Sequence, residues 1–444
     1  MKKIYKTLLI MLISSLLLCS CNKKQNEKIT LTIWASEEDQ EMIKQMCNEF
    51  KQVNKDKEYE FLFGVEGEGD MANKVLNDVT QGPDVYSFAS DQINKLYAGG
   101  ALARVGGENE KKVKEMNTSG SVDAATIKVN NEEQLYAYPS TGDNCYFLYY
   151  DKRVYTNPSQ VETLDSILDI AKQSGKKFHF RLNDDGWYLS SFFFAKPELK
   201  YNVTYSQSMV EEKVEINFDS NEGLDVMKSL RTYINHDAMI AQTDDSKMIA
   251  AFTPNANGHI TASACVSGTW NAKTIKNLLG EHFGVAKLPT AKISGKETQL
   301  SGFMGYKLIG VNGYSKNKAE AHKLALFLTN EQNQLKRYQV RGFAPTNKNV
   351  SNYEIIKKDP VISVVLAQAQ LKRTQKGVPN NYWTPMASLI TPIIAAKDQN
   401  KTVSDNELLE LLKATCNSIR KKWKTKCLPI FSFFLKNIIK YVKI

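Results

Sequence analysis

The chain has 444 residues, 42% of them hydrophobic and 24% charged, which is the composition of a soluble protein long enough to bury substantial cores in two or three domains. Its net charge of +10 comes from the two ends, since residues 1–20 and 417–444 together carry eleven lysines and arginines and no acid. The remaining body holds 47 basic and 48 acidic residues. This balance argues against a phosphate-binding surface, and we therefore expect no nucleic acid partner.

The N-terminus has the pattern of a secretion signal. The basic segment MKKIYK precedes TLLIMLISSLLL, an apolar stretch too short to span a bilayer. The end of this segment, Leu18-Cys19-Ser20-Cys21, resembles a bacterial lipobox, which implies lipid attachment at Cys21. The alternative is an ordinary cleaved signal with a coincidental cysteine. Acyl chains at Cys21 would hold a soluble domain at the extracellular face of the cell membrane.

Strand and helix patterns alternate after the signal, which indicates a parallel α/β sheet. The expected elements are a strand at 31–34, a helix around 42–50, a strand at 59–65, a helix at 71–79 and a turn and strand at 82–88. Ligands bind at the carboxyl ends of the strands in such sheets. We therefore expect Ser36, Glu38 and Asp91 beside one site. Ser36 is also a candidate helix N-cap, and N-capping is the structural alternative for Asp91.

Residues 135–150, LYAYPSTGDNCYFLYY, join two strand-like aromatic runs through a polar break that contains glycine. This pattern predicts that the chain crosses here between two lobes. We expect the hinge at residues 140–144, with Asp143 as a candidate ligand-binding residue.

The second half of the chain contains three aromatic segments that we expect to be exposed. Asp185, Trp187 and Tyr188 lie in DDGWY, which we place on a turn between strands at 178–180 and 214–218. SACVSGTW predicts a strand and turn ending at Trp270, and NYWTP predicts an exposed aromatic pair that includes Trp383. Helices are expected at 161–171, 223–233 and 403–419. We expect Trp34, on the first strand, to be part of the core.

No pattern indicates an enzyme, a cofactor or a metal site. The chain lacks H-E-x-x-H, G-x-S-x-G and a P-loop, its five histidines are isolated, and its cysteines form no C-x-x-C pair. Asp184 and Asp185 are adjacent, so they cannot flank a glycosidic bond, although a partner carboxylate elsewhere would leave a glycosidase open. Flat aromatic rings combined with acids instead suit the C–H faces and hydroxyl rim of a sugar. The rings are Trp187, Tyr188, Trp270 and Trp383, and the acids are Glu38, Asp91, Asp143 and Asp185.

Three passages resemble the extracellular solute-binding proteins of ABC importers, in the carbohydrate (maltodextrin)-binding branch. They are LYAYP followed by YYDK, GPDVYSFASDQINKLYAGGALARV, and the stretch from SGFMGYKLIGVNGYSKNKAEAHKLALFL to RGFAPTNKN, within a resemblance from Leu31 to Lys413. The resemblance implies a two-lobed periplasmic-binding-protein-like α/β fold, in which each lobe is a mostly parallel sheet flanked by helices around a hinged cleft. The expected segments are a signal peptide (1–20), a tether (21–28), a first lobe (29–141 and 285–343), a second lobe (142–284 and 344–416) and a basic, apolar tail (417–444).

The same resemblance implies a monomeric, lipid-anchored subunit that captures a malto-oligosaccharide-like ligand by hinge closure and delivers it to the permease subunits. It also implies that Trp187, Trp270 and Trp383 stack on sugar rings. Gln92 and Asp39 stand where the family usually has basic residues, which leaves other oligosaccharides open. A surface sugar sensor or adhesin without transport is the alternative. Residues 417–444 lie beyond the resemblance, and we expect either a basic amphipathic helix on the membrane or an appendage with no role.

Overall fold

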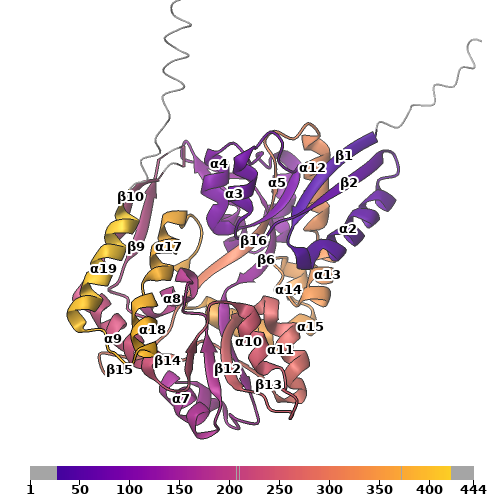
Figure 1. Ribbon diagram of the computed structural model, residues 1–444. Coiled ribbons are helices and arrows are strands. Elements are labelled where there is room, and N and C mark those ends of the chain that lie inside the picture. The colour runs from indigo at the N-terminus through magenta and orange to yellow at the C-terminus, as the bar shows by residue number, and fades with distance from the viewer. Residues whose placement is uncertain (1–27, 207, 210, 372, 422–444) are drawn as a thin grey trace, which may run out of the picture.

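The computed structural model describes residues 28–206, 208–209, 211–371 and 373–421. These residues form two lobes, each built on one β-sheet flanked by helices (Figure 1). The predicted α/β, two-lobed fold is therefore confirmed. The expected signal peptide, Cys21 and the amphipathic C-terminal segment lie outside the described residues.

The first lobe contains a six-stranded sheet of order β17-β16-β3-β1-β2, with β6 also paired to β16. Its strands are β1 (Lys28–Ala35), β2 (Glu58–Val65), β3 (Val85–Ala89), β6 (Tyr138–Asn144), β16 (Phe303–Val311) and β17 (Arg373–Thr374). β1 runs parallel to β2 and β3, whereas β16 runs antiparallel to β3 and β6. The helices of this lobe include α2 (Gln40–Val53), α3 (Met71–Asn77), α4 (Ile93–Ala98), α5 (Gly107–Met116), α6 (Ser119–Ala124), α12 (Lys318–Leu328) and α13 (Glu331–Arg341), with the hairpin β4–β5 (Thr126–Val129 and Glu132–Leu135).

The second lobe contains a five-stranded sheet of order β11-β8-β12-β7-β13. Its strands are β7 (Tyr146–Asp151), β8 (Lys177–Phe180), β11 (Met239–Ala241), β12 (Ala262–Gly268) and β13 (Phe283–Ala286). β8 pairs in parallel with β11 and β12, and β7 pairs antiparallel with β12 and β13. Both sheets are thus mixed, whereas mostly parallel sheets were expected. The antiparallel pairs all involve β7 or β16. These two strands enter their sheets from the other lobe, whereas parallel neighbours within a sheet are joined by a crossover helix.

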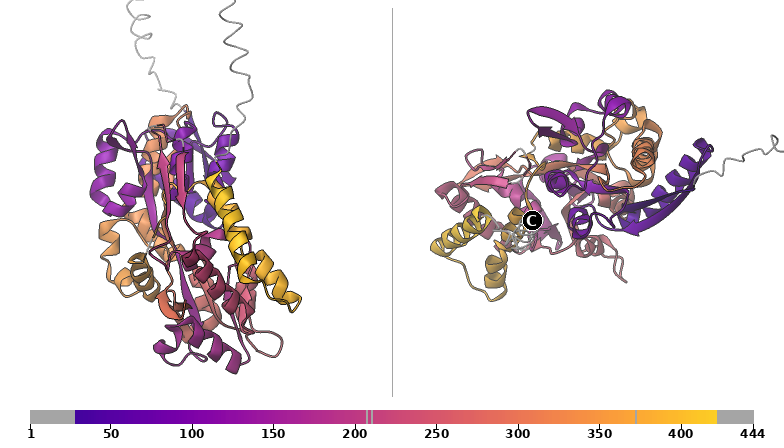
Figure 2. Two further views of the ribbon diagram at one scale, coloured as in Figure 1. Left: turned by 90° about the vertical axis from the view of Figure 1, so that its left-hand side faces the viewer. Right: turned by 90° about the horizontal axis from the view of Figure 1, so that it is seen from above.

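Helices and hairpins surround this second sheet. The helices include α7 (Leu164–Gln173), α8 (Gly186–Phe193), α9 (Asn221–Asn235), α10 (Asp245–Phe252), α11 (Ala272–Leu279), α16 (Pro360–Ala369), α17 (Asn380–Ser388), α18 (Thr391–Asp398) and α19 (Asp405–Arg420). The hairpins are β9–β10 (Tyr201–Tyr205 and Glu211–Ile216) and β14–β15 (Thr290–Ile293 and Lys296–Gln299). The last helix, α19, packs on α9, α17 and β10 and runs lengthwise along one side of the molecule (Figure 2). All six residues of β7 are buried, since alternate side chains enter two different hydrophobic clusters.

The chain passes from the first sheet to the second at Cys145, between β6 and β7. The expected hinge at residues 140–144 is therefore part of a strand, because β16 supplies hydrogen-bonding partners for this polar segment, with irregular register. Asp143 is 1% exposed and accepts a hydrogen bond from the backbone N–H of Ala344, at 3.0 Å. An isolated bridge between Thr141 and Pro345 lies beside this bond. These contacts place the chain at the lobe boundary expected between residues 343 and 344 directly against the first crossing.

The boundary expected at residue 285 differs from the sheet topology. β13, which spans this position, hydrogen-bonds to β7 in the second sheet. The chain rejoins the first sheet only with β16, after the β14–β15 hairpin. β17 adds a later contact with the same strand, because it pairs in parallel with β16. The chain therefore passes between the lobes near Cys145, between β15 and β16 and near residue 344, and it returns briefly to the first sheet at β17, between α16 and α17.

Close packing between α8 and α17 requires glycine at position 186. A Cβ atom at Gly186 would lie 2.6 Å from the backbone oxygen of Trp383 and 2.7 Å from Cβ of Met386. Both neighbours are backbone or the first side-chain atom, so they cannot turn away without moving α17. We expect Gly186→Ala to lower the free energy of unfolding by about 1–3 kcal/mol, measured by urea denaturation.

Gly67→Ala is the matched control, since a Cβ atom at Gly67 would meet no atom within 4 Å. Its stability should stay within about 0.5 kcal/mol of the wild type. Equal stability of the Gly186 and Gly67 variants would contradict close packing of α8 against α17.

Candidate ligand-binding site

The segment DDGWY is the start of a helix and not a turn. Asp185 is the N-cap of α8 and accepts hydrogen bonds from the backbone N–H groups of Trp187, at 2.9 Å, and Tyr188, at 3.2 Å. Neighbouring residues on a helix point in different directions, and the two aromatics consequently separate. Trp187 is half-buried, whereas Tyr188 is 1% exposed and lies in the core. Of the two aromatics expected to be exposed, only Trp187 is therefore accessible.

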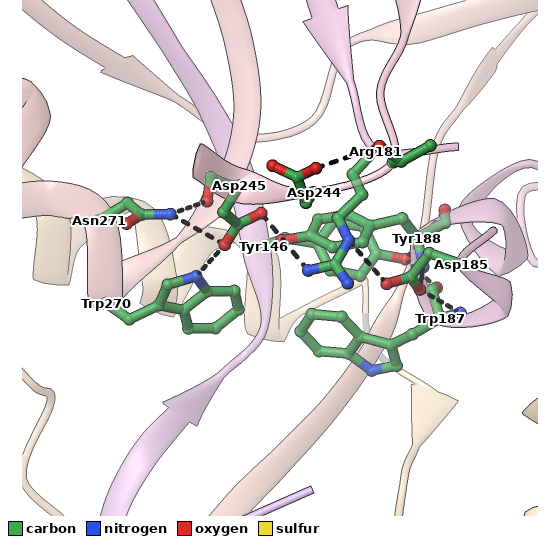
Figure 3. A network of polar contacts seen from close by, with 11 residues as sticks. Tyr146, Arg181, Asp185, Trp187, Tyr188, Asp244, Asp245, Trp270 and Asn271 are labelled. Atoms are coloured by element: carbon green, nitrogen blue, oxygen red, sulfur yellow. Dashed lines mark hydrogen bonds and ion pairs between the residues drawn. The ribbon is translucent and has the colours of Figure 1, made fainter. Parts of the chain in front are cut away.

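Trp270 reaches the same region from the end of β12. It lies in the short 3-10 helix η4 (Thr269–Asn271), and its indole Nε1–H donates to Oδ2 of Asp245 at 2.6 Å. Asn271 donates to the same oxygen at 2.9 Å. The ring centroids of Trp187 and Trp270 are 5.9 Å apart and their planes are tilted by 35° (Figure 3). The structure therefore brings together two predicted tryptophans that are 83 positions apart in the sequence.

Arg181 lies between the two carboxylates that support these rings. Its Nε is 3.1 Å from Oδ2 of Asp185, and its Nη1 is 3.6 Å from Oδ1 of Asp245 (Figure 3). Burial raises the pKa of Asp185, while the charge of Arg181 and the two backbone donors act in the opposite direction. The cation between the two acids offsets part of the cost of burying them and fixes the starts of α8 and α10 relative to each other.

A side-chain relay links Trp187 to the first lobe. The indole Nε1–H of Trp187 donates to Oε1 of Gln375 at 3.2 Å, and Nε2 of Gln375 donates to Oδ1 of Asp91 at 3.1 Å. Asn144, at the end of β6, also donates to Oε1 of Gln375, at 3.0 Å. Asp91 is thus linked to Trp187 by hydrogen bonds through Gln375.

Asp91 lies in the 3-10 helix η2 (Ser90–Gln92) and is not the N-cap of α4, a position held by Gln92. Burial raises its pKa from the ordinary value of 3.8 to about 7. Gln92 has a different role, since its side chain accepts from the N–H of Ala72 and donates to the carbonyls of Glu68 and Gly69. The amide of Gln92 therefore organises the loop before α3, which a basic side chain could not do because it has no acceptor.

The other predicted site residues lie apart from this network. Ser36 is buried and its hydroxyl makes no N-cap hydrogen bond, contrary to the expected capping role, and Glu38 is exposed. Asp143 is enclosed at the crossing, where burial raises its pKa. Trp383 lies in α17, with ring contacts to Phe303 at 5.3 Å and Tyr382 at 5.1 Å. Tyr382 is completely buried, so NYWTP does not form the exposed pair that was expected.

Several residues of the network were not predicted from the sequence. They are Tyr146, Arg181, Asp245, Asn271 and Gln375. Tyr146 fixes the start of α8, since its hydroxyl donates to the carbonyl of Trp187 at 2.9 Å. A weak signal existed for Arg181 alone, which precedes Asp185 by four residues. Trp34, expected in the core, is half-buried.

Neither a metal site nor a membrane-spanning helix is found in the described residues. Within the part of the chain that the structure describes, no group of three or more His, Cys, Asp or Glu residues is placed to hold a metal ion. In the same residues, no helix is both long and apolar enough to cross a bilayer.

Two mixed α/β lobes joined by several chain crossings, with paired aromatic rings and acids beside the junction, are the features of a two-lobed solute-binding protein. The chain belongs to the bacterial extracellular solute-binding protein family, which matches residues 45–363. Two relatives are described as binding proteins. The galactooligosaccharide-binding protein of Bacillus subtilis strain 168 is 27% identical over 334 residues, covering 73% of this chain and 75% of the relative. The maltotriose-binding protein of Pyrococcus abyssi is 24% identical over 307 residues, covering 68% of this chain and 63% of the relative.

Solved structures share the fold over nearly their whole length. One protein solved with acarbose is 27% identical, with a TM-score of 0.75 and coverage of 88% of this chain and 99% of the other. The unliganded maltodextrin-binding protein from L. casei BL23 is 20% identical, with a TM-score of 0.70 and coverage of 89% and 100%. The family expected from the sequence is therefore confirmed.

The raised pKa of Asp91 predicts a pH-dependent stability. The unfolded chain releases this proton near pH 4 and the folded protein near pH 7, so the stabilisation from the protonated group is present below pH 4 and lost as the pH rises to about 7. We expect the unfolding free energy of the wild type to fall by about 1–4 kcal/mol relative to Asp91→Asn over this range. Urea denaturation of both proteins at each pH measures the difference, and a constant difference would contradict the raised pKa.

Proposed function

We propose that this protein is the oligosaccharide-binding subunit of an ABC sugar importer, and that it binds its ligand at the Trp187–Trp270 pair. The observation that carries the proposal is the arrangement of these two half-buried rings, 5.9 Å apart, beside the acids Asp185 and Asp245. A sugar presents an apolar C–H face and a rim of hydroxyls. Two neighbouring rings suit successive sugar units, and carboxylate oxygens suit their hydroxyls.

The proposed ligand is a malto- or galacto-oligosaccharide. Support comes from the relatives, which are described as binding galactooligosaccharide and maltotriose, and from structural neighbours solved with acarbose and with maltotetraose. The Trp pair recognises C–H faces, which these sugars share.

Capture follows from the placement of the site beside the junction of the lobes. A ligand on the Trp pair of the second lobe that also contacts the first lobe, near Asp91, would stabilise the arrangement in which the lobes are close together. Binding energy is then gained only when both lobes engage the sugar. The permease subunits would recognise this liganded form and accept the sugar from it.

Replacing Trp270 tests the proposed site. Trp270→Ala removes a stacking surface whose contribution is on the order of 0.5–1.5 kcal/mol beyond its buried area, so sugar affinity should weaken by about tenfold or more. Isothermal titration with a panel of malto- and galacto-oligosaccharides measures the effect, with circular dichroism to verify the fold. Phe63→Ala is the control, since Phe63 is an exposed aromatic (36%) on β2, outside the network. Unchanged affinity in alanine variants of Trp187, Trp270 and Trp383 would contradict a stacking role.

We also propose that Cys21 carries lipid and holds the protein at the cell surface, because Leu18-Cys19-Ser20-Cys21 follows an apolar signal core. Metabolic labelling with a fatty-acid analogue should mark the wild type and Cys19→Ala but not Cys21→Ala. A label retained in Cys21→Ala would overturn this part of the proposal.

A further inference from the structure

Gln375 occupies a position where four separate segments of the chain meet. It follows β17, its side chain is almost fully buried (6% exposed), and its own N–H donates to the carbonyl of Met304 in β16 at 3.1 Å. Its amide contacts Trp187 from α8, Asp91 from η2 and Asn144 from the end of β6. No other side chain in the described residues is bonded to both Trp187 and Asp91.

The chemistry of the partners fixes the orientation of the amide. An indole Nε1–H can only donate a hydrogen bond, so the oxygen of Gln375 must face Trp187. The amide nitrogen then faces Asp91, whose carboxyl oxygen accepts. A side chain that joins a donor to an acceptor must itself offer both groups. Glu in its ionised form and Lys each lack one of them, which explains the requirement for an amide.

The backbone opposite Gln375 is also adapted to this arrangement. A Cβ atom at Gly305 would lie 2.7 Å from Oε1 of Gln375 and 2.9 Å from Nδ2 of Asn144. Glycine in β16 therefore leaves the space that the amides occupy. Gln375 is buried and Trp187 is half-buried. The hydrogen bond between them therefore holds the partly accessible indole ring at its Nε1–H group.

We propose that Gln375 is a positioning residue for ligand binding, which fixes the Trp187 ring through its indole N–H and ties it to Asp91 of the first lobe. This inference rests on the proposed function, because it assigns Trp187 a stacking role. The orientation of the ring in the second lobe consequently depends on the position of the first lobe. The Trp187 ring has the orientation that binds ligand when Gln375 keeps its hydrogen bonds to Trp187, Asp91 and Asn144. The arrangement of the lobes and the ligand affinity are therefore coupled through Asp91, Asn144 and Gln375.

Two substitutions remove the two sides of the same hydrogen bond. Trp187→Phe keeps a flat ring and loses the N–H donor, and Gln375→Leu keeps the approximate size and loses the amide. Each should weaken the affinity for maltotriose or a galactotriose by roughly threefold to tenfold. The loss in the double variant should be smaller than the product of the two single losses, because both changes delete the same Trp187–Gln375 hydrogen bond. Losses that multiply in the double variant would overturn the inference.

A ligand-free measurement separates this inference from the proposed function. In protein labelled with ¹⁵N-tryptophan, the indole resonance of Trp187 is identified by its absence from Trp187→Phe. Gln375→Leu and Gly305→Ala should both shift this resonance and speed its exchange with water. An unmoved resonance in Gln375→Leu overturns the inference whether or not sugar binds, and so does a moved resonance with unchanged affinity. A wild type that binds neither sugar refutes the proposed function, while the indole resonance still decides whether Gln375 holds Trp187.

Gln368→Leu is the matched control for loss of a buried amide. Gln368 is 4% exposed, and its oxygen accepts from the N–H of Leu288 at 2.9 Å, outside the relay. This variant should lose stability but keep both the Trp187 resonance and the sugar affinity of the wild type. Equal effects of the Gln368 and Gln375 variants on affinity would reduce Gln375 to a general structural role and overturn the inference.

Discussion

The cation of Arg181, held between Asp185 and Asp245, is the interaction on which the candidate site depends. The two carboxylates are drawn close together, and two negative charges in a poorly solvated region would repel each other without a cation between them. Each carboxylate also makes a second interaction, since Asp185 caps α8 below Trp187 and Asp245 holds the indole N–H of Trp270. The single guanidinium therefore sets the relation between the two rings.

The junction between the lobes follows a different principle, because it depends on backbone pairing and buried polar groups instead of charge. β6 and β7 are separated by one residue, so their sheets cannot move far apart at this point. Asp143 is enclosed there and accepts a hydrogen bond from the N–H of Ala344, which joins the crossing near Cys145 to the one near residue 344. A lobe rotation about this region would have to be distributed over backbone torsions near Cys145, near residue 302, near residue 344 and on both sides of β17. Two of the three hydrophobic clusters are formed largely within one lobe, whereas the third joins β7 and β12 to Met304 of β16 and Tyr338 of α13 and would have to adjust in such a motion.

Local patterns predicted most of the secondary structure, since strand and helix periodicity is a property of neighbouring residues. They failed where tertiary contacts decide the outcome. Residues 140–144 contain glycine and polar side chains and were expected to form a hinge, yet pairing with β16 makes them a strand. Tyr188, expected on a turn, and Tyr382, expected in an exposed aromatic pair, both lie in helices whose geometry turns them into the core. The partners Asp245 and Gln375 could not be predicted, because polar residues on separate segments carry no local signal of a shared contact.

The network also indicates how the site would distinguish its ligands. Asp185, Asp245 and Gln375 already use hydrogen-bonding capacity within the protein, and Gln92 is committed to the loop before α3. The groups left for a ligand are therefore the ring faces of Trp187 and Trp270 and the remaining lone pairs of the carboxylates. Ring faces recognise the flat C–H side of a sugar with little regard to linkage, whereas lone pairs discriminate the position of hydroxyls. Under the proposed function, such a site would accept a class of oligosaccharides through stacking and rank its members through a few hydroxyl contacts, an arrangement compatible with relatives described as binding galactooligosaccharide and maltotriose.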